Sequence, residues 1–159
     1  MSTEPMRALS VQQPYLGAII FGGKTPENRD WPAPPWAIGH DIALHASKKP
    51  DWDAPLYAWD AAGLVPPWVT GRTQANWCRD NAAVLGAVLA VAAVAGCHHS
   101  SASECQCGRW AIDGQFHWMP DDIRPMAGPV PCGGALKLWR LPEDVEKLVR
   151  AQLSGDDRP

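Results

Sequence analysis

Prolines constrain the fold of this sequence more than any other residue type. Sixteen of them interrupt the 159 residues repeatedly. Proline lacks the amide hydrogen that a helix interior needs, and its ring clashes with the preceding helical turn. The chain is therefore not a helical bundle, and we predict an α+β fold with many irregular connections.

A short helix is expected over residues 14–21. Pro14 suits the first position of a helix, and the glycine pair that follows the segment provides a natural end. Leu16, Ile19 and Ile20 have the spacing that places side chains on one helical face. A helix this short is not stable alone, so this face must pack against the rest of the domain.

The polar segment after that helix gathers four side chains that can act on a ligand. Side chains of an extended strand alternate between its faces, so Glu27, Arg29 and Trp31 share one face. Lys24 stands at the turn between the helix and this strand. The spacing therefore predicts one cluster made of Lys24, Glu27, Arg29 and Trp31.

The remaining pattern predicts about five to six strands, with helices near both ends of the chain. An alternating strand is expected over 41–47, and residues 83–96 are apolar on both faces, as in a central buried strand. Further strands are expected over 109–118, with a break near Asp113-Gly114, and over 135–141, before a helix over 142–153. The segments expected to be mostly irregular are 64–80, 97–108 and 119–134.

The chain length suits one domain over 1–159. Its core is expected over about 7–152, with a variable segment at about 48–83 and a frayed tail at 154–159. The expected architecture is a small mixed β-barrel or curled sheet with flanking helices.

Charge limits the partners that this chain can have. The formal net charge is −3 and the pI about 5.9, whereas a protein that coats nucleic acid through bulk charge is basic. A nucleic-acid role therefore needs a local pocket or patch. The first residues lack the apolar stretch of a signal peptide, and the apolar run 82–96 is too short for a membrane span. We expect a cytoplasmic protein without membrane attachment or a disulfide framework.

Two parts of the sequence resemble the ASCH family, whose members have a PUA-like β-barrel fold. The first part joins Gln13-Pro14 to a Gly-x-Lys-x-x-Glu-x-Arg motif, here Gly22 to Arg29, and continues into the strand "IALHASK". The second part is the late stretch "FHW…DIRPM…PVPCGGALKLWRL". The resemblance covers about residues 9–141 and is weakest in the variable segment.

The resemblance implies a cleft on the barrel that is lined by Lys24, Glu27 and Arg29. It also implies RNA, or a modified nucleobase or nucleoside, as the ligand. Some relatives are reported as ribonucleases or as amidohydrolases that act on an acylated cytidine, and others are regarded as binding modules.

The sequence departs from the family pattern at two places. Amidohydrolase-like relatives carry a threonine three residues after the lysine, where this chain has Glu27; here Thr25 lies next to the lysine instead. Many relatives also carry a basic residue just before the glycine that precedes the "HAS" strand, where this chain has Ile38-Gly39. The first difference argues against the amidohydrolase activity, and the second removes one phosphate contact that the family pattern offers.

The charged residues of the motif have distinct roles in such a cleft. Arg29 can hold a phosphate or a base edge through two hydrogen bonds, and Lys24 acts as a point charge. Glu27 can accept from an exocyclic amine. A lysine–glutamate pair can also act as acid and base, so Lys24 and Glu27 are the catalytic candidates if the protein is an enzyme. The alternative is a structural salt bridge between Glu27 and either cation.

Aromatic and polar residues complete the predicted ligand site. Trp31 or Trp110 can stack on an unpaired base. His45 and Ser47 share a strand face, where they either line the same cleft or form a hydrogen-bonded pair on the barrel wall. The full set of ligand-binding candidates is Gln13, Lys24, Glu27, Arg29, Trp31, His45, Ser47 and Trp110.

A segment rich in cysteine and histidine offers zinc ligands. The usual cysteine pair with two to four intervening residues is missing, because a single residue separates the last two cysteines. We therefore assign no cofactor and keep a structural zinc as the lesser alternative to a loop with reduced thiols. The ligands in that alternative would come from Cys97, His98, His99, Cys105 and Cys107.

Tryptophans punctuate the variable segment. They either clamp this segment over the barrel or form an exposed surface for a protein partner; they are Trp52, Trp59, Trp68 and Trp77. Three functions therefore stay open: binding of RNA or a modified nucleoside, hydrolysis in the same cleft by a ribonuclease or nucleoside amidohydrolase, and partner binding through the tryptophan-rich segment.

Overall fold

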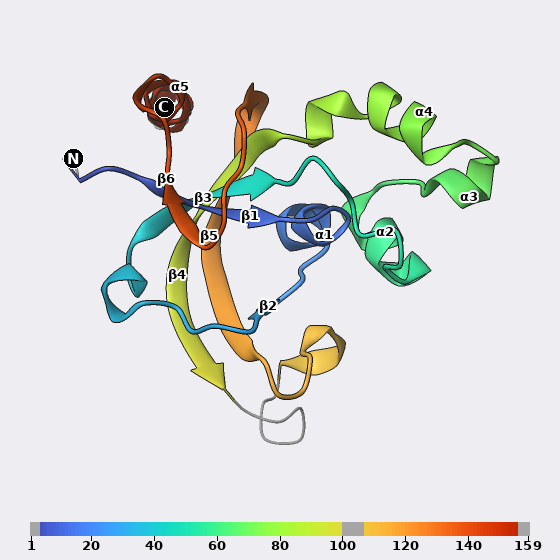
Figure 1. The fold of residues 1–159 in the computed structure, drawn as a ribbon. Coiled ribbons are helices and arrows are strands. Elements are labelled where there is room, and N and C mark those ends of the chain that lie inside the picture. Colours follow the sequence, from blue (N-terminus) through green and yellow to red (C-terminus); the bar gives the residue numbers. More distant parts are fainter. Residues whose placement is uncertain (1–3, 100–106, 156–159) are drawn as a thin grey trace.

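One curled sheet organises the part of the chain that the computed structural model describes, residues 4–99 and 107–155 (Figure 1). Its strand order is β2-β5-β4-β3-β1-β6. β1 runs parallel to β3, and the other neighbouring pairs are antiparallel. The strands are β1 (Arg7–Val11), β2 (Glu27–Arg29), β3 (Asp41–Ala46), β4 (Ala87–His99), β5 (Phe116–Pro131) and β6 (Leu138–Arg140). The expected α+β class with a small mixed, curled sheet is confirmed.

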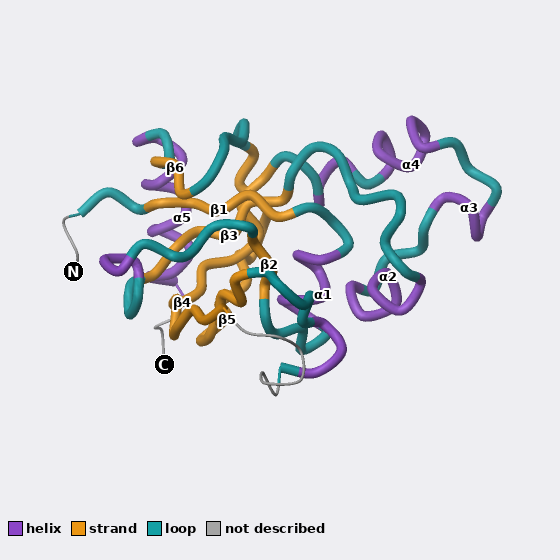
Figure 2. Tube along the Cα trace, turned by 60° about the horizontal axis from the view of Figure 1, so that its bottom comes forward, coloured by secondary structure: helices purple, strands orange, loops and turns teal. Residues whose placement is uncertain are grey.

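The helices lie at two opposite ends of this sheet. α5 lies at one end, and α2, α3 and α4 project from the other (Figure 2). The α-helices are α1 (Tyr15–Phe21), α2 (Leu56–Ala62), α3 (Pro67–Thr70), α4 (Gln74–Asp80) and α5 (Glu143–Gly155), and the 3₁₀ turns are η1 (Pro35–Ala37), η2 (Ala82–Val84) and η3 (Gly108–Trp110). Of these described helices, none has the length and apolar character needed to cross a membrane.

Successive side chains of a strand point to opposite faces of the sheet. In this sheet apolar side chains are buried on both faces. The concave layer includes Ile42, Leu44 and Ala46 of β3 and packs against Leu16 and Ile19 of α1. The opposite layer packs against α5; its members include Ala8, Ala43, Val88, Val91, Trp139, Val145 and Val149. The predicted apolar faces of 14–21 and 41–47 are therefore confirmed, and β4 is the buried central strand expected from its composition.

The prediction of an irregular segment over 119–134 is wrong. Most of it belongs to β5, although this strand carries prolines such as Pro120 and Pro125. β2 pairs with β5 only as far as Trp118, so the rest of β5 is hydrogen-bonded to β4 alone. Proline is tolerated on such a one-sided strand because its missing amide hydrogen has no partner to lose.

Other boundaries also differ from the expected ones. β1 was not expected, although it is the parallel partner of β3. The strand expected over 109–118 begins only at Phe116, because η3 and a turn precede it. β4 extends to His99, into the segment expected to be a loop, and β6 covers only the last part of 135–141. Within α5, Val145 and Val149 are buried, whereas Leu148 is 57% exposed.

The variable segment between β3 and β4 folds around its own aromatic core. Trp59 and Trp77 are buried, with ring centroids 5.5 Å apart, and Trp52 stacks on Trp59 at 6.2 Å. Both buried indoles donate to backbone carbonyls, Trp59 to Ala54 at 3.2 Å and Trp77 to Val65 at 2.6 Å. These three tryptophans therefore hold the segment together.

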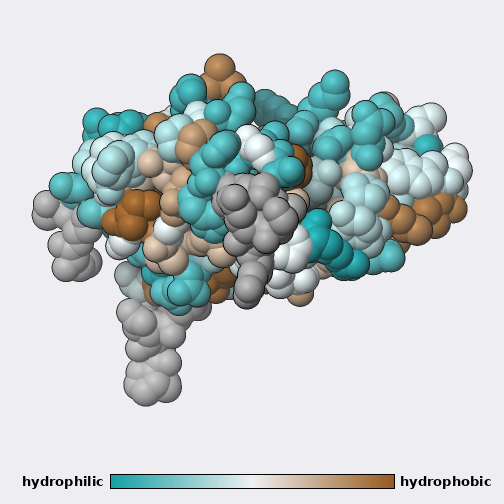
Figure 3. All heavy atoms as spheres, turned by 90° about the horizontal axis from the view of Figure 1, so that it is seen from below, coloured by the Kyte–Doolittle hydropathy of each residue, from teal (hydrophilic) through white to brown (hydrophobic). Residues whose placement is uncertain are grey.

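Apolar residues also reach the surface at this end of the molecule. Trp68 is half exposed and packs edge-on against Trp59. Figure 3 shows apolar residues at the end that carries α2 and α3, and smaller separate patches among hydrophilic residues elsewhere on that face. A surface for a protein partner stays a prediction, and it would have to use Trp68 and its exposed neighbours Val65 and Val69.

The close contact between α1 and α2 gives a test of this packing. A Cβ atom added at Gly22 would lie 2.5 Å from the carbonyl oxygen of Ala61, a backbone atom that cannot move aside easily. Gly22→Ala should therefore lower the free energy of unfolding by about 1–3 kcal/mol, measured by urea denaturation. Gly96→Ala is the matched control, because no atom lies within 4 Å of its added Cβ. Equal stability of the two variants would contradict the close packing.

Candidate functional site

The predicted charged cluster forms where α1 turns into β2. The amide of Lys24 donates to Ala18 O at 3.0 Å, which closes the end of α1 and fixes the direction of the lysine. Its Nζ atom donates to Glu27 Oε1 at 3.0 Å and to Pro26 O at 2.5 Å. Arg29 Nε donates to Glu27 Oε2 at 3.0 Å. The Glu27 carboxylate therefore lies between two cations.

Both salt bridges considered as the structural alternative are present, from Glu27 to Lys24 and to Arg29, and they are largely buried. Lys24 is 2% exposed and Glu27 is 8% exposed. Arg29 continues the network into the sheet, because its Nη2 donates to the carbonyl of Ser10 in β1 at 2.6 Å. Charges that lose their water in this way must be compensated by partners. The three side chains carry a net charge of +1, so the cluster attracts an anionic group.

A cavity of about 320 Å³ opens next to the cluster. That volume lies at the lower end of the range for small-molecule sites. Its walls combine charged, polar and aromatic side chains from β1, α1, β2, α2 and η3 and from the connections between them. The lining residues are Ser10, Val11, Gln12, Tyr15, Lys24, Glu27, Asn28, Arg29, Asp51, Tyr57, Arg109, Trp110 and Ile112.

One wall of the cavity is aromatic and cationic. The guanidinium of Arg109 lies 4.4 Å from the ring centroid of Tyr57, and the Tyr57 and Trp110 rings meet edge to face at 5.2 Å. Lys24 Nζ lies 5.9 Å from the Trp110 ring. Asn28 positions this wall, since its amide donates to Trp110 O and its carbonyl accepts from Ile112 N, both at 2.8 Å.

The phenol of Tyr15 faces the carboxylate of Asp51 in the same cavity. Burial, the Asp51 charge and a hydrogen bond to Asp51 raise the pKa of Tyr15 to about 12. The phenol therefore remains a hydrogen-bond donor at neutral pH, and Asp51 remains close by as an acceptor.

A second, more open groove of about 620 Å³ joins the cavity. Ser10, Gln12 and Arg29 line both spaces. The remaining groove lining comes from the end of β3 and from the segment before β6; it consists of His45, Ser47, Lys48, Gly134, Ala135, Leu136 and Lys137.

His45 belongs to a hydrogen-bond relay at the floor of this groove. Trp139 Nε1 donates to Ser10 Oγ at 3.1 Å, and Ser10 Oγ lies 3.0 Å from His45 Nδ1. His45 Nε2 lies 2.7 Å from the carbonyl of Cys132, which can only accept, so Nε2 carries the proton and Nδ1 accepts from Ser10. Burial lowers the pKa of His45 and Lys48 adds to this effect, although the Cys132 hydrogen bond opposes it. The imidazole is therefore neutral near pH 7.

The structure brings most, but not all, of the predicted site residues to these two spaces. Lys24, Glu27, Arg29 and Trp110 line the cavity, and His45 and Ser47 line the groove together with Arg29. The other two candidates line neither space, and they are Gln13 and Trp31.

Gln13 and Trp31 instead hold neighbouring segments together. Gln13 is 2% exposed; it accepts from Gly17 N at 2.8 Å and donates to Val84 O at 3.2 Å. Trp31 packs edge-on against Trp118 with ring centroids 4.8 Å apart. Both side chains therefore make these contacts outside the cavity, although Lys137 of the groove lies with its Nζ 4.8 Å from the centroid of the Trp31 ring.

Sequence reasoning missed several residues that line the cavity. Tyr15 follows the predicted Gln-Pro pair, and Arg109 precedes the predicted Trp110, so both had a local signal. Asp51 and Tyr57 had none, because the variable segment brings them to the site from a distant part of the chain.

The curled mixed sheet, with its first helix packed on the concave layer, has the fold seen in ASCH domain structures. The fold is similar to the crystal structure of ASCH from Zymomonas mobilis, with a TM-score of 0.56, 13% identity, and coverage of 92% of this chain and 94% of that chain. Crystal structures of two substituted variants of that protein align similarly. One has a TM-score of 0.55 and 13% identity, and the alignment covers 93% of this chain and 98% of that chain. The other has a TM-score of 0.55 and 12% identity, and the alignment covers 95% of this chain and 98% of that chain. The sequence matches no protein-family model and no curated protein. The resemblance noted in the sequence is thus confirmed for the fold.

Replacing Glu27 tests how far the cluster depends on its carboxylate. Glu27→Gln keeps the shape of the side chain but leaves Lys24 as a buried charge without an anion. We expect the free energy of unfolding to fall by about 3–5 kcal/mol in urea denaturation. Glu143→Gln is the control, because Glu143 forms an exposed pair with Lys147, and such pairs contribute less than about 1 kcal/mol. Similar losses in both variants would show that the cluster is not buried in solution.

The raised pKa of Tyr15 makes stability depend on pH. The unfolded chain loses the phenolic proton near the ordinary pKa of 10.0, whereas the folded chain keeps it to about 12. The unfolded state is therefore favoured progressively as pH rises from 10 to 12, and stability from this group is complete below that window. Alkaline absorbance titration should show a late tyrosinate step that is absent in Tyr15→Phe. A late step that persists in this variant would contradict the assignment.

Proposed function

We propose that the protein is an ASCH-family binder of RNA or a modified nucleoside, with the base in the smaller cavity and the phosphate in the more open groove. The observation that carries this proposal is the continuity of the two spaces through Ser10, Gln12 and Arg29. A ligand with one flat aromatic part and one anionic part fits such a pair of spaces. Arg29 lies at their junction.

The smaller cavity has the chemistry of a base site. Tyr57 and Trp110 offer ring faces or edges for contact with a base, and Arg109 offers a planar cation next to them. Asp51 can accept hydrogen bonds from an exocyclic amine, and the phenol oxygen of Tyr15, whose proton is donated to Asp51, can accept another. Stacking and edge recognition together favour a single unpaired base over a duplex.

The open groove has the chemistry of a phosphate site. Among the described residues that line the groove, three are lysine or arginine and none is acidic. The three are Arg29, Lys48 and Lys137. This local positive surface reconciles phosphate binding with a formal net charge of −3. A chain with a negative net charge can bind nucleic acid only through such a local positive patch.

Hydrolysis is the second candidate function. The Lys24–Glu27 pair, with Nζ and Oε1 3.0 Å apart, borders the cavity where a bound base or its acyl substituent would lie. A lysine and a carboxylate in such a site can transfer protons during acyl or phosphoryl transfer. We keep a ribonuclease or nucleoside amidohydrolase as the alternative, and the gels described below test the ribonuclease.

Fluorescence polarisation with labelled single-stranded RNA, tRNA and DNA tests this proposal, with free nucleosides as competitors. Arg109→Ala should weaken binding about tenfold, because it removes the cation next to the stacked base. Lys137→Ala should weaken polymer binding and leave nucleoside competition unchanged. It should also reduce the slope of the logarithm of affinity against the logarithm of salt concentration by about one. Arg79→Ala is the matched control, since this exposed arginine lines neither space.

Denaturing gels of the bound RNA separate a binder from a nuclease. Cleavage that Lys24→Ala abolishes while the variant remains folded would establish the hydrolase. If Arg109→Ala and Lys137→Ala bind as tightly as wild type, neither the cavity nor the groove takes part in binding. If the protein binds none of the polymers or nucleosides, the proposal is overturned.

A further inference from the structure

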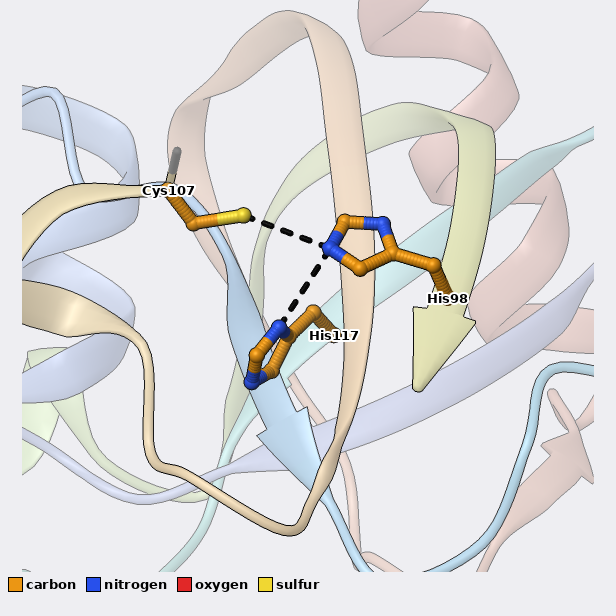
Figure 4. A group of neighbouring side chains, drawn as sticks. All are labelled: His98, Cys107 and His117. Atoms are coloured by element: carbon orange, nitrogen blue, oxygen red, sulfur yellow. Dashed lines mark hydrogen bonds between the residues drawn. The ribbon is translucent and has the colours of Figure 1, made fainter. Parts of the chain in front are cut away.

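A second group of chemistry-bearing side chains lies outside the cavity, where β4 and β5 are paired. His98 near the end of β4 lies opposite His117 near the start of β5. Cys107, just before η3, points its sulfur toward the same place (Figure 4). The Nε2 atom of His98 lies 3.3 Å from Cys107 Sγ and 3.3 Å from His117 Nδ1. All three ligand atoms lie within 4.8 Å of one another.

The tautomer of His117 is set by a contact on the far side of its ring. His117 is fully buried, and its Nε2 lies 2.8 Å from the carbonyl oxygen of Ile112. A carbonyl only accepts, so Nε2 carries the proton and Nδ1 presents a lone pair to His98 and Cys107. Histidines that bind metals are oriented by just such a second hydrogen bond to a carbonyl or carboxylate.

Two of the three distances between the ligand atoms suit a tetrahedral ion. Bond lengths of about 2.0–2.1 Å to nitrogen and 2.3 Å to sulfur at a tetrahedral angle place two nitrogens about 3.3 Å apart and a nitrogen and a sulfur about 3.6 Å apart. The distances of 3.3 Å from His98 Nε2 to Cys107 Sγ and to His117 Nδ1 are therefore close to the edges of a zinc coordination tetrahedron. Nitrogen and sulfur donors select zinc over magnesium or calcium, which prefer oxygen.

We propose that the reduced chain binds one zinc ion through His98 Nε2, Cys107 Sγ and His117 Nδ1, with water or a further ligand in the fourth position. This set differs from the five residues considered from the sequence. Cys97 Sγ instead accepts from Ala33 N at 3.4 Å, and His99 Nε2 lies 3.0 Å from Gly114 O. Cys105 lies outside the described residues.

The redox state of Cys107 decides whether this site exists. Cys107 is disulfide-bonded in the structure, and a disulfide sulfur is not a thiolate ligand. A dithiol reductant supplies two electrons and two protons, which convert the disulfide to two thiols while the dithiol itself becomes a disulfide. Zinc then displaces the proton of the Cys107 thiol as the sulfur–metal bond forms. The same cysteine therefore forms a zinc site under reducing conditions and a disulfide under oxidising conditions.

The metal would also fix one wall of the cavity. Cys107 and His117 bracket the segment that carries Arg109 and Trp110, and His117 already holds Ile112 through its carbonyl. A zinc ion that joins both ends of this segment to β4 would restrict its motion. Its role at this position is structural, since the described contacts route no reacting group to it.

Metal analysis of the full-length chain tests the proposal. The protein is reduced, stripped with a chelator, reloaded with zinc and passed through a desalting column, and its zinc content is measured by mass spectrometry. Wild type and His99→Gln should hold about one zinc ion per chain, whereas Cys107→Ser and His98→Gln should hold less than about a tenth of that. His99→Gln is the matched control, because it removes the neighbouring imidazole. Circular dichroism checks that each variant is folded.

Cobalt provides a second readout of the sulfur ligand. The reduced, cobalt-loaded wild type should show a thiolate-to-cobalt charge-transfer band in the near ultraviolet, and folded Cys107→Ser should lack it. Reduced wild type without zinc, zinc retained by Cys107→Ser, or equal loss in His98→Gln and His99→Gln would each overturn the proposal. These readouts do not depend on RNA or nucleoside binding, so this proposal and the proposed function can fail separately.

Discussion

The structure of the site depends on one carboxylate held between two cations. Glu27 compensates the buried charge of Lys24 with one oxygen and binds Arg29 with the other. Through these partners it joins the end of α1, strand β2 and the carbonyl of Ser10 in β1. Such a buried network adds little net stability, because desolvation offsets the attraction, but it fixes one arrangement of the segments that meet there. The cavity and the groove both take their shape from that arrangement.

The charged cluster could be predicted because its residues are close in sequence. Lys24, Glu27 and Arg29 lie within one turn and one short strand, so helix-end and strand geometry place them together. The other walls come from residues distant in sequence, such as Asp51, Tyr57 and Arg109. Strand β5 was missed for another reason: its prolines argue against a strand, and the limited pairing of β2 and the irregular β4–β5 register make them acceptable.

The histidine pair shows the same limit of sequence reasoning. His98 lies in a segment whose composition suggested metal binding, whereas His117 lies 19 residues further along the chain. The two imidazoles meet because of the β4–β5 register, which includes three irregularities. No spacing rule in the sequence reveals that register, so a ligand set drawn from neighbouring residues alone was incomplete.

The variable segment begins after the end of β3 and ends beside that same strand end, just before β4. Gly86 N donates to the carbonyl of Ala46 at 2.8 Å, so the intervening chain forms a closed excursion with its own tryptophan core. Doubling the length of such an excursion costs only about 0.6 kcal/mol in closure free energy. Because this excursion carries Asp51 and Tyr57, substitutions or insertions within it can reshape one side of the cavity while the sheet and the Lys24–Glu27–Arg29 cluster stay intact.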